Sequence, residues 1–396
     1  MNFYFADLHI HIGTNEAGKW IKIPTSRQLT VRNICDHASR EKGLHIIGLV
    51  DTMSPLVQQD IRRMIDEGLL VPLSGGGYRY NNCLTVLLGA EIETKEPQGG
   101  MAHTLLFLPD LKSMESFTNY MGQFISNINL STQNAHMPIS QLVDIALSHQ
   151  AVIIPAHVFT PYKSVYGSVA CRLSHILTDR QIAKLAAIEL GLSADTYMAD
   201  RIAELFHFTF LTNSDAHSLQ KIAREYTVFL CEEPDFREVT QVLFRTNGRK
   251  AVSNFGLDPR LGKYHRTVCE ACGSLDQTGV SARGRCQACG SKNIVKGVLD
   301  RINQIADYAE SLHPDHRPPY HYQIPLEFIP GLGKKAMQSL LAVFDTEMNI
   351  IHQADEGKLK AVVGDKLAAA ILAARVGHTS IQDGGGGRYG KVLTKK

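Results

Sequence analysis

Short hydrophobic runs alternate with amphipathic stretches from residue 3 to about residue 245 of this 396-residue chain. The runs span residues 3–6, 45–50, 84–90, 103–108, 151–155, 185–190 and 208–212. They are too short for buried helices, so we interpret them as strands. The amphipathic stretches 30–42, 139–149 and 179–184 predict helices between them. Such alternation predicts βα units and a parallel barrel, here with seven strands rather than the usual eight.

The pattern changes after the last of these runs. Residues 254–262 are rich in Gly, Pro, Asp and Asn, which predicts a linker. A cysteine-containing segment and then helix-like stretches follow. We therefore expect a barrel over 1–253, a linker and small module over 254–297, a helical domain over 298–380 and a flexible Gly/Lys tail over 381–396, where Lys391, Lys395 and Lys396 lie.

Composition and charge narrow the class of protein. With 44% hydrophobic and 20% charged residues, the chain is typical of a soluble globular protein. No apolar run approaches the about 20 residues that span a bilayer, and the N-terminus has no basic leader, so we expect no membrane contact and a cytoplasmic, nucleoid-associated protein. The net charge of +2 divides into −4 over 1–259 and +6 over 260–396. A metalloenzyme joined to an anion-binding module fits this asymmetry, and chance unevenness is the alternative.

Four of the eight cysteines form the pattern CxxC-x13-CxxC, in which Gly follows each pair. They are Cys269, Cys272, Cys286 and Cys289. Each CxxC presents two thiolates to one tetrahedral ion, and a segment of this length needs a metal or a cross-link to hold its fold. We interpret the module as a structural zinc site; a disulfide pair and an iron–sulfur cluster are the alternatives. Four thiolates fill the coordination shell, so this zinc is not catalytic.

Eight residues that bind metals well lie at the ends of the hydrophobic runs. They are His9, His11, Asp51, Glu91, His103, His157, Asp215 and His217. Imidazoles and carboxylates that converge on one face of a barrel hold a cluster of ions with positions left for water. His9 and His11 stand two residues apart on a strand, so they share a face, and Asp215 and His217 repeat this spacing. The sequence therefore predicts a catalytic metal site.

Two glycine-containing segments remain to be interpreted. Ser74-Gly75-Gly76-Gly77 has no Lys-Ser/Thr after it, so a hairpin turn is favoured over a phosphate cradle. Gly331, Gly333, Lys334 and Lys335 open an apolar helix, and this turn exposes backbone N–H groups and positive charge at a helix N-terminus. It resembles the helix-hairpin-helix motif, which binds DNA phosphates without reading bases. An ordinary pair of helices is the alternative.

Two further matches lie within the same region. Residues 362–367 contain a degenerate second copy of the hairpin, in which Asp365 would repel a phosphate. Gln338, Leu341 and Phe344 have the spacing of a sliding-clamp peptide, although their position inside a helix favours core packing for the apolar members.

The ligand set resembles the PHP (polymerase and histidinol phosphatase) superfamily, a distorted (β/α)7 barrel with up to three metals. The order of barrel, zinc module and helical hairpin is similar to the endonuclease Q family, as are the segments 154–161, 188–195 and 212–218. The likeness covers nearly all residues except the Gly-rich tail. Many PHP proteins carry Thr-Asp-His where this chain has Val50-Asp51-Thr52, so two or three divalent ions (Zn, Mn or Mg) remain open.

The resemblance implies a DNA repair endonuclease that cleaves 5′ of a deaminated base (uracil, hypoxanthine or xanthine) or of an abasic site. Its partners would be double-stranded and single-stranded DNA with such a lesion. Asp215, Glu91 and Asp51 would be catalytic, with Asp215 as a bridging carboxylate, and Glu189 would orient a ligand or a lysine.

A flipped lesion would enter a pocket near two polar segments. The candidate pocket elements are the loop 19–30, with Trp20, Ser26 and Arg27, and the segment 162–166. Two alternative functions are a PHP-type phosphoesterase acting on a small phosphomonoester and a non-catalytic DNA-binding protein.

Overall fold

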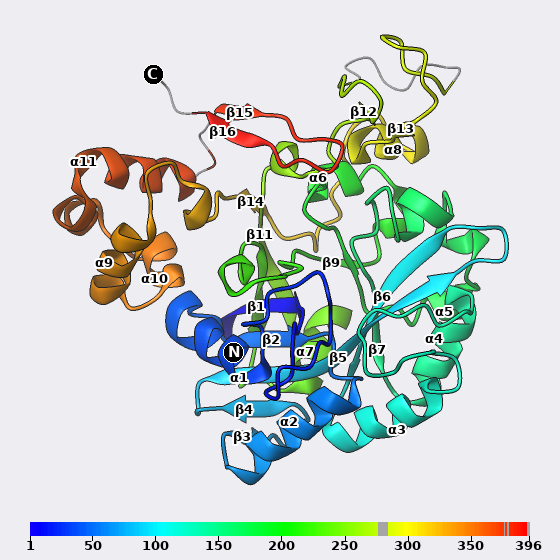
Figure 1. The fold of residues 1–396 in the computed structure, drawn as a ribbon, viewed down its shortest axis with the longest axis horizontal. Helices are drawn as coiled ribbons and strands as arrows, with labels where there is room; N and C mark the ends of the chain where they lie inside the picture. Colours follow the sequence, from blue (N-terminus) through cyan, green and yellow to red (C-terminus); the bar gives the residue numbers. More distant parts are fainter. Residues whose placement is uncertain (276–283, 376, 378–379, 394–396) are drawn as a thin grey trace.

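The computed structural model describes residues 1–275, 284–375, 377 and 380–393 (Figure 1). All seven predicted strands form, and the prediction is confirmed. They are β1 (Asn2–Ile10), β2 (Ile46–Leu49), β5 (Leu84–Lys95), β6 (Met101–Leu108), β7 (Val152–Pro155), β8 (Ala187–Glu189) and β9 (Thr209–Leu211). Isolated bridges join Ile153 of β7 to Leu185, just before β8, and Ile10 of β1 to Ala216, in the turn after β9. The seven strands therefore close into a barrel.

The alternation of elements predicted a wholly parallel barrel. The structure instead contains both parallel and antiparallel strand pairs. β1, β2 and β5 are parallel neighbours, and so are β8 and β9. β6, however, runs antiparallel to both β5 and β7. Only residues 96–100 separate β5 from β6, whereas a parallel connection needs a dozen or more residues. Gly99 and Gly100 adopt positive φ in this turn, so the chain reverses directly into a hairpin.

Helices cover the outside of the barrel. They are α1 (Val31–His37), α2 (Pro55–Asp66), α3 (Leu111–Met121), α4 (Ile139–Ser148), α5 (Asp179–Ile182) and α6 (Thr196–Ala199). The predicted helix over 30–42 divides into α1, capped by the Thr30 side chain on the Asn33 N–H, and a π-helical turn over Ala38–Lys42. Their apolar faces join the barrel strands in one large core.

The sheet continues beyond the predicted strands. β10 (Tyr226–Cys231) pairs antiparallel with β1, α7 (Phe236–Phe244) follows, and β11 (Lys250–Gly256) pairs with β10. The predicted boundary at residue 253 thus falls inside a strand. On the other edge, β3 (Leu70–Pro72) and β4 (Tyr78–Tyr80) form an antiparallel hairpin around residues 74–77, which confirms the predicted turn.

The region after the barrel contains a small module and a helical unit. β12 (Val268–Cys269) and β13 (Ile294–Val295) pair next to α8 (Val298–Ile305), whose apolar face packs into the barrel core. β14 (Tyr320–Tyr322) pairs with β11 and leads to α9 (Lys334–Phe344), α10 (Glu347–His352) and α11 (Glu356–Arg375). These last helices surround a core of their own, beside β1 and β2 (Figure 1). No helix within the described part of the chain is long and apolar enough to cross a membrane.

The C-terminal segment is not the flexible tail that its composition predicted. β15 (Ser380–Gln382) and β16 (Lys391–Leu393) form an antiparallel hairpin, drawn in red in Figure 1. Glycine at position 390 allows the backbone of the hairpin to pack closely against residue 260, since a Cβ there would lie 2.5 Å from the Arg260 carbonyl oxygen. Lys391 lies in β16, whereas Lys395 and Lys396 lie outside the described residues. The prediction of a flexible tail is therefore wrong for residues 381–393.

Glu225, just before β10, gives the fold a pH dependence. It is fully buried, its Oε1 accepts the Leu257 N–H at 2.8 Å, and its Oε2 has no hydrogen-bond partner among the described residues. Burial raises the pKa of Glu225 to about 8. Because an unfolded glutamate titrates near about 4.3, the folded protein keeps a proton that the unfolded chain loses, and stability falls as the pH rises from about 4 towards 8.

We expect Glu225→Gln to raise the melting temperature at pH 9 by at least about 2 °C and to flatten the decline between pH 5 and 8. Glutamine keeps the acceptor for Leu257 but carries no charge at any pH. Thermal unfolding followed by circular dichroism across this range measures the effect. A parallel, undiminished decline in parent and variant would contradict it.

Candidate metal centre

Six of the eight predicted ligands gather into two groups at one end of the barrel. One group is His9, His11 and Asp215; the other is Glu91, His103 and His157. Within each group, one potential ligand atom from every residue lies within 4.8 Å of the others. The first group comes from β1 and the turn after β9, and the second from β5, β6 and the end of β7. Strands far apart in sequence therefore supply each group.

The Glu91 carboxylate lies between the two groups. Its Oε1 is 2.8 Å from His103 Nδ1, 3.3 Å from His157 Nε2 and 3.5 Å from His9 Nε2. Its Oε2 is 3.5 Å from His11 Nε2. In the first group, Asp215 Oδ1 lies 3.5 Å from His9 Nε2 and 3.3 Å from His11 Nε2. Glu91 contacts imidazoles of both groups and would help to hold ions at either one.

The charges of these residues fit divalent cations. Burial opposes ionisation of Glu91, but His103 and Lys22 hold the pKa of that carboxyl well below its usual range. Burial likewise opposes a charge on His9, yet Glu189 and Asp215 outweigh it and raise its pKa to about 10. Buried carboxylates that stay ionised call for positive charge beside them, and a set of four imidazoles and two carboxylates suits Zn or Mn better than Mg.

Asp51 does not lie among the ligand atoms, which departs from the sequence prediction. Both of its oxygens are 3.1 Å from His11 Nδ1, one also accepts the Ile12 N–H at 2.5 Å, and Ser131 Oγ donates to the other. The Asp51 carboxylate thus contacts the Nδ1 atom of His11, whereas Nε2 of the same ring lies near Glu91 and Asp215. The signal that misled the prediction is the strand-end position, which Asp51 shares with true ligand candidates.

Glu189 has the corresponding place behind His9. Its Oε1 lies 3.0 Å from His9 Nδ1 and 2.8 Å from Asn213 Nδ2, and its Oε2 accepts the His157 N–H at 2.8 Å. A carboxylate on Nδ1 fixes the tautomer and directs the Nε2 lone pair outward. This is the orienting position that we expected from the sequence.

These two geometries make Asp51→Asn a discriminating variant. We expect this variant to weaken binding of the ion held by His9, His11 and Asp215 by about 10- to 100-fold. The number of ions bound at saturation should not fall, because Asp51 orients a ligand rather than serving as one. Chelator competition and metal analysis measure both quantities. Asp66→Asn, an exposed carboxylate at the end of α2, is the matched control. Loss of one ion at saturation would instead make Asp51 a ligand.

His217 lies beside the two groups rather than within them. Its ring packs against His11 with centroids 4.7 Å apart, and its Nδ1–H donates to the Asp215 carbonyl oxygen at 3.0 Å. Burial lowers the pKa of His217 to about 4, despite the neighbouring Asp215. The imidazole is therefore neutral at pH 7, and its Nε2 is free to accept a hydrogen bond or an ion.

A pocket of about 390 Å³ opens over these residues. It is lined by His11, Ile21, Lys22, Ile23, Pro24, Glu91, His103, Leu130, Ser131, Thr132, Gln133, His157, Lys163, Asp215, His217 and Lys263. Of the two predicted pocket segments, residues 21–24 and Lys163 contribute. Trp20, Ser26 and Arg27 are not part of the lining; Arg27 instead stacks over Trp20, with its guanidinium carbon 4.9 Å from the ring centroid.

Lys22 is a site residue that sequence reasoning did not single out. Its Nζ lies 3.0 Å from Glu91 Oε2, 3.0 Å from His11 Nε2 and 2.7 Å from Thr132 Oγ1. The side chain is only 11% exposed. A single lysine in a polar loop has no spacing pattern that marks it. Its contact with both ligand groups is therefore visible only in the folded chain.

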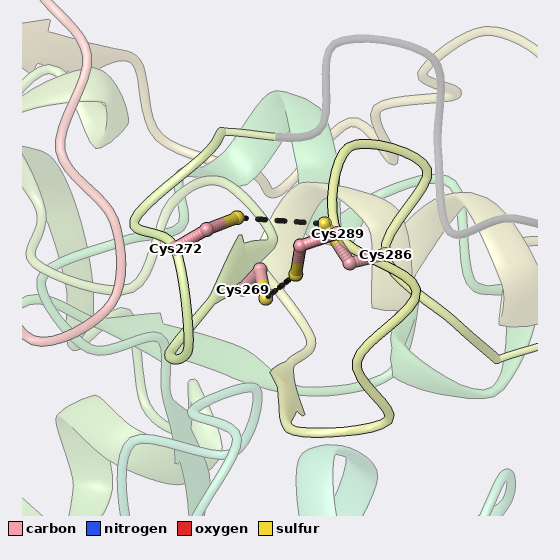
Figure 2. Close-up of side chains that lie close together, drawn as sticks. All are labelled: Cys269, Cys272, Cys286 and Cys289. Carbon is pink, nitrogen blue, oxygen red and sulfur yellow. Dashed lines mark hydrogen bonds between the residues drawn. The ribbon is translucent and has the colours of Figure 1, made fainter.

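The four predicted zinc ligands also come together (Figure 2). Cys269 Sγ lies 3.6 Å from Cys289 Sγ, and Cys272 Sγ lies 3.6 Å from Cys286 Sγ. Tetrahedral zinc with Zn–S bonds of about 2.3 Å puts sulfurs about 3.8 Å apart, and a disulfide would need about 2.05 Å. Gly273 and Gly290, at φ 71° and 73°, complete the two knuckles. The donors therefore fit one structural zinc.

The predicted phosphate-binding turn lies before α9. Gly331 has φ 90° with open space around it, and Gly333 is the N-cap of the helix. Lys334 and Lys335 are exposed in the first turn. The chain also breaks at Gly364, with φ 78° inside α11, where the second copy was predicted. Phe344 is buried in the core of the helical unit, so the sliding-clamp interpretation has no support.

Comparison with known proteins agrees with this architecture. A family model described as PHP-associated matches residues 195–245. The uncharacterized protein YqxK of Bacillus subtilis (strain 168) is 42% identical over 394 residues, which cover 99% of this chain and 100% of the relative.

Two solved structures align over the full chain, each with a TM-score of 0.85 and 32% identity. One is the lesion-specific endonuclease PfuEndoQ from Pyrococcus furiosus, of which 96% is covered. The other is Endonuclease Q in complex with a 27-mer duplex substrate with an abasic lesion at the active site, of which 97% is covered. Along this chain a PHP-type barrel is followed by a four-cysteine cluster and then by a helical C-terminal region. With these features and the full-length likeness to both structures, the chain belongs to the endonuclease Q family.

Proposed function

We propose that this protein is a metal-dependent DNA repair endonuclease that cleaves the phosphodiester 5′ of a deaminated base (uracil, hypoxanthine or xanthine) or of an abasic site. The observation that carries this proposal is the full-length likeness to PfuEndoQ, a lesion-specific endonuclease. The two ligand groups at the floor of one pocket support it. A duplex with an abasic lesion occupies the active site of the second structure, which supports DNA as the substrate.

The six residues of the two groups would hold two divalent ions. When bound, such ions supply Lewis acidity and positive charge for the attack of water on phosphorus. Glu91 and Asp215 hold negative charge at the centre, while Lys22 places an ammonium group at the pocket wall. His217 lines the same pocket, and its neutral imidazole would accept a hydrogen bond there through Nε2.

The rim of the pocket suits an extruded nucleotide. Lys263 and Lys163, which pairs with Glu93 at 2.8 Å, line the pocket and would attract backbone phosphates, and Ile23 is an exposed hydrophobic side chain of the same lining. Exposed apolar side chains at a DNA surface can insert between base steps and partly unstack them. A deaminated base forms a mismatch, which lowers the cost of unpairing and so favours the lesion.

The turn before α9 would bind the DNA backbone away from the lesion. Exposed N–H groups at the N-terminus of α9 and the charges of Lys334 and Lys335 suit a phosphate and carry no base specificity. We expect replacement of either lysine by alanine to weaken binding equally for lesion and intact duplexes and to reduce the slope of log K against log salt by about 1. Fluorescence anisotropy at several salt concentrations measures the slope. Lys358→Ala, which removes an exposed lysine of α11, is the control.

The cleavage proposal is tested with a labelled duplex that contains one uracil or one hypoxanthine. The purified, metal-loaded protein should nick the lesion strand on the 5′ side and leave the matched intact duplex uncut. A chromogenic phosphomonoester is tested in parallel. Phosphate release without nicking would favour a small-molecule phosphoesterase, and lesion binding without either reaction would make the protein a binding module.

A further inference from the structure

Arg224 is a buried cation with an unusual set of partners. The residue is only 6% exposed, and within the described part of the chain it forms no ion pair with a carboxylate. Its Nε donates to the Ser214 carbonyl at 2.7 Å and its Nη2 to the Asp215 carbonyl at 3.2 Å. Its Nη1 donates to the hydroxyl of Tyr389 at 2.9 Å. One guanidinium therefore joins the turn of a metal ligand to the C-terminal hairpin.

The turn that Arg224 holds needs such support. Asp215 has φ 45°, a left-handed conformation that a residue with a Cβ keeps only where its surroundings hold it. Its carboxylate reaches His9 and His11 from this backbone position. A small rotation of the turn would move Oδ1 away from both imidazoles. Hydrogen bonds to two successive carbonyls oppose that rotation.

The C-terminal hairpin fixes the other end of the connection. The Gly384 N–H donates to the Arg260 carbonyl at 2.7 Å, and the Gly390 N–H donates to the Leu261 carbonyl at 2.9 Å. This close approach is open only to glycine at both positions. Tyr389 lies next to Gly390, and its ring packs edge-on against Phe328, with centroids 6.4 Å apart. The phenol is thereby held against Arg224.

We propose that Tyr389 and Arg224 are positioning residues for Asp215, so that the docked C-terminal hairpin sets the ion affinity of the group formed by His9, His11 and Asp215. This inference rests on the proposed metal centre. It assigns a role to the Gly-rich segment, which the sequence alone suggested was a solvated tail.

The test uses Tyr389→Phe in the full-length protein, because this variant removes only the hydroxyl and keeps the ring. We expect the dissociation constant of the ion held by His9, His11 and Asp215 to rise about tenfold, the lower end of the effect of partners behind a ligand. Competition between a chromophoric chelator and the protein measures it in the absence of DNA. The zinc of the four cysteines and the melting temperature should not change. Tyr120→Phe, an exposed tyrosine of α3, is the matched control.

A second readout separates positioning from DNA contact. Nicking by Tyr389→Phe should be reduced at limiting metal and return to the parent rate at saturating metal. The visible spectrum of the Co²⁺-loaded barrel should shift in Arg224→Lys, since an ammonium group cannot hold both carbonyls and the phenol together.

An unchanged ion affinity in Tyr389→Phe would overturn the inference while leaving the proposed function intact. If DNA binding weakens at the same time, Tyr389 is a DNA contact instead. A parent protein that binds no ion beyond the cysteine-bound zinc would overturn both, and the DNA-free measurement distinguishes this case.

Discussion

Asp215→Asn is expected to reduce nicking of lesion-containing DNA by at least about 10³-fold, because a ligand carboxylate at the centre contributes several kcal/mol of charge stabilisation. Asparagine has the same size, so the left-handed turn at residue 215 and its bonds to Arg224 can persist. What is lost is the anionic ligand oxygen that lies 3.5 Å from His9 Nε2 and 3.3 Å from His11 Nε2. One barrel ion should therefore bind weakly or be lost.

Single-turnover nicking and metal analysis of the same preparation measure this prediction. Asp66→Asn again serves as the control, since it removes an exposed carboxylate far from the pocket lining. DNA binding by Asp215→Asn should remain close to that of the parent, because the basic residues of the pocket rim and of the α9 turn are untouched. Retention of full nicking would exclude Asp215 from the ion-binding group.

Cys286→Ser is expected to release the structural zinc and loosen the module over residues 263–275 and 284–297. The apparent binding energy of structural zinc in small zinc modules is about 10–16 kcal/mol at pH 7, and it is folding energy for a segment with little core. A hydrogen bond from Ser274 lowers the pKa of Cys286 to about 6, so this thiol is ready to bind as thiolate. Removing it should cost more than removing an exposed cysteine outside the cluster, such as Cys83 or Cys171.

Zinc content by mass spectrometry should fall by one ion per chain in Cys286→Ser. Hydrogen exchange should accelerate in the module. The barrel should keep its melting temperature, because none of the four cysteines of the module belongs to the barrel core. Cys83→Ser removes an exposed cysteine outside the cluster and is the control. Unchanged zinc content or unchanged exchange in the module would exclude a structural role for this thiolate.

Sequence patterns predicted the features that depend on neighbouring residues. All seven strand runs are strands, since a short apolar run bounded by polar turns is a local property. The CxxC pairs converge because two-residue spacing already forms a knuckle. The ends of the hydrophobic runs predicted the six residues of the two ligand groups, although β5 continues past Glu91 to Lys95 and His103 lies near the start of β6.

Only the tertiary structure decided which polar residue does what. Asp51 and Glu91 have the same strand-end signal, yet one lies behind His11 and the other between the two groups, because the register of β2 and β5 sets their depth. Lys22 reaches Glu91 across 69 residues of chain and Tyr389 reaches Arg224 across 165. Such contacts leave no local periodicity, because they are made by elements that meet only when the barrel closes and the C-terminal hairpin docks. Composition marked that hairpin as solvated, whereas its glycines are needed for close packing, a distinction that depends on what each backbone atom meets in space.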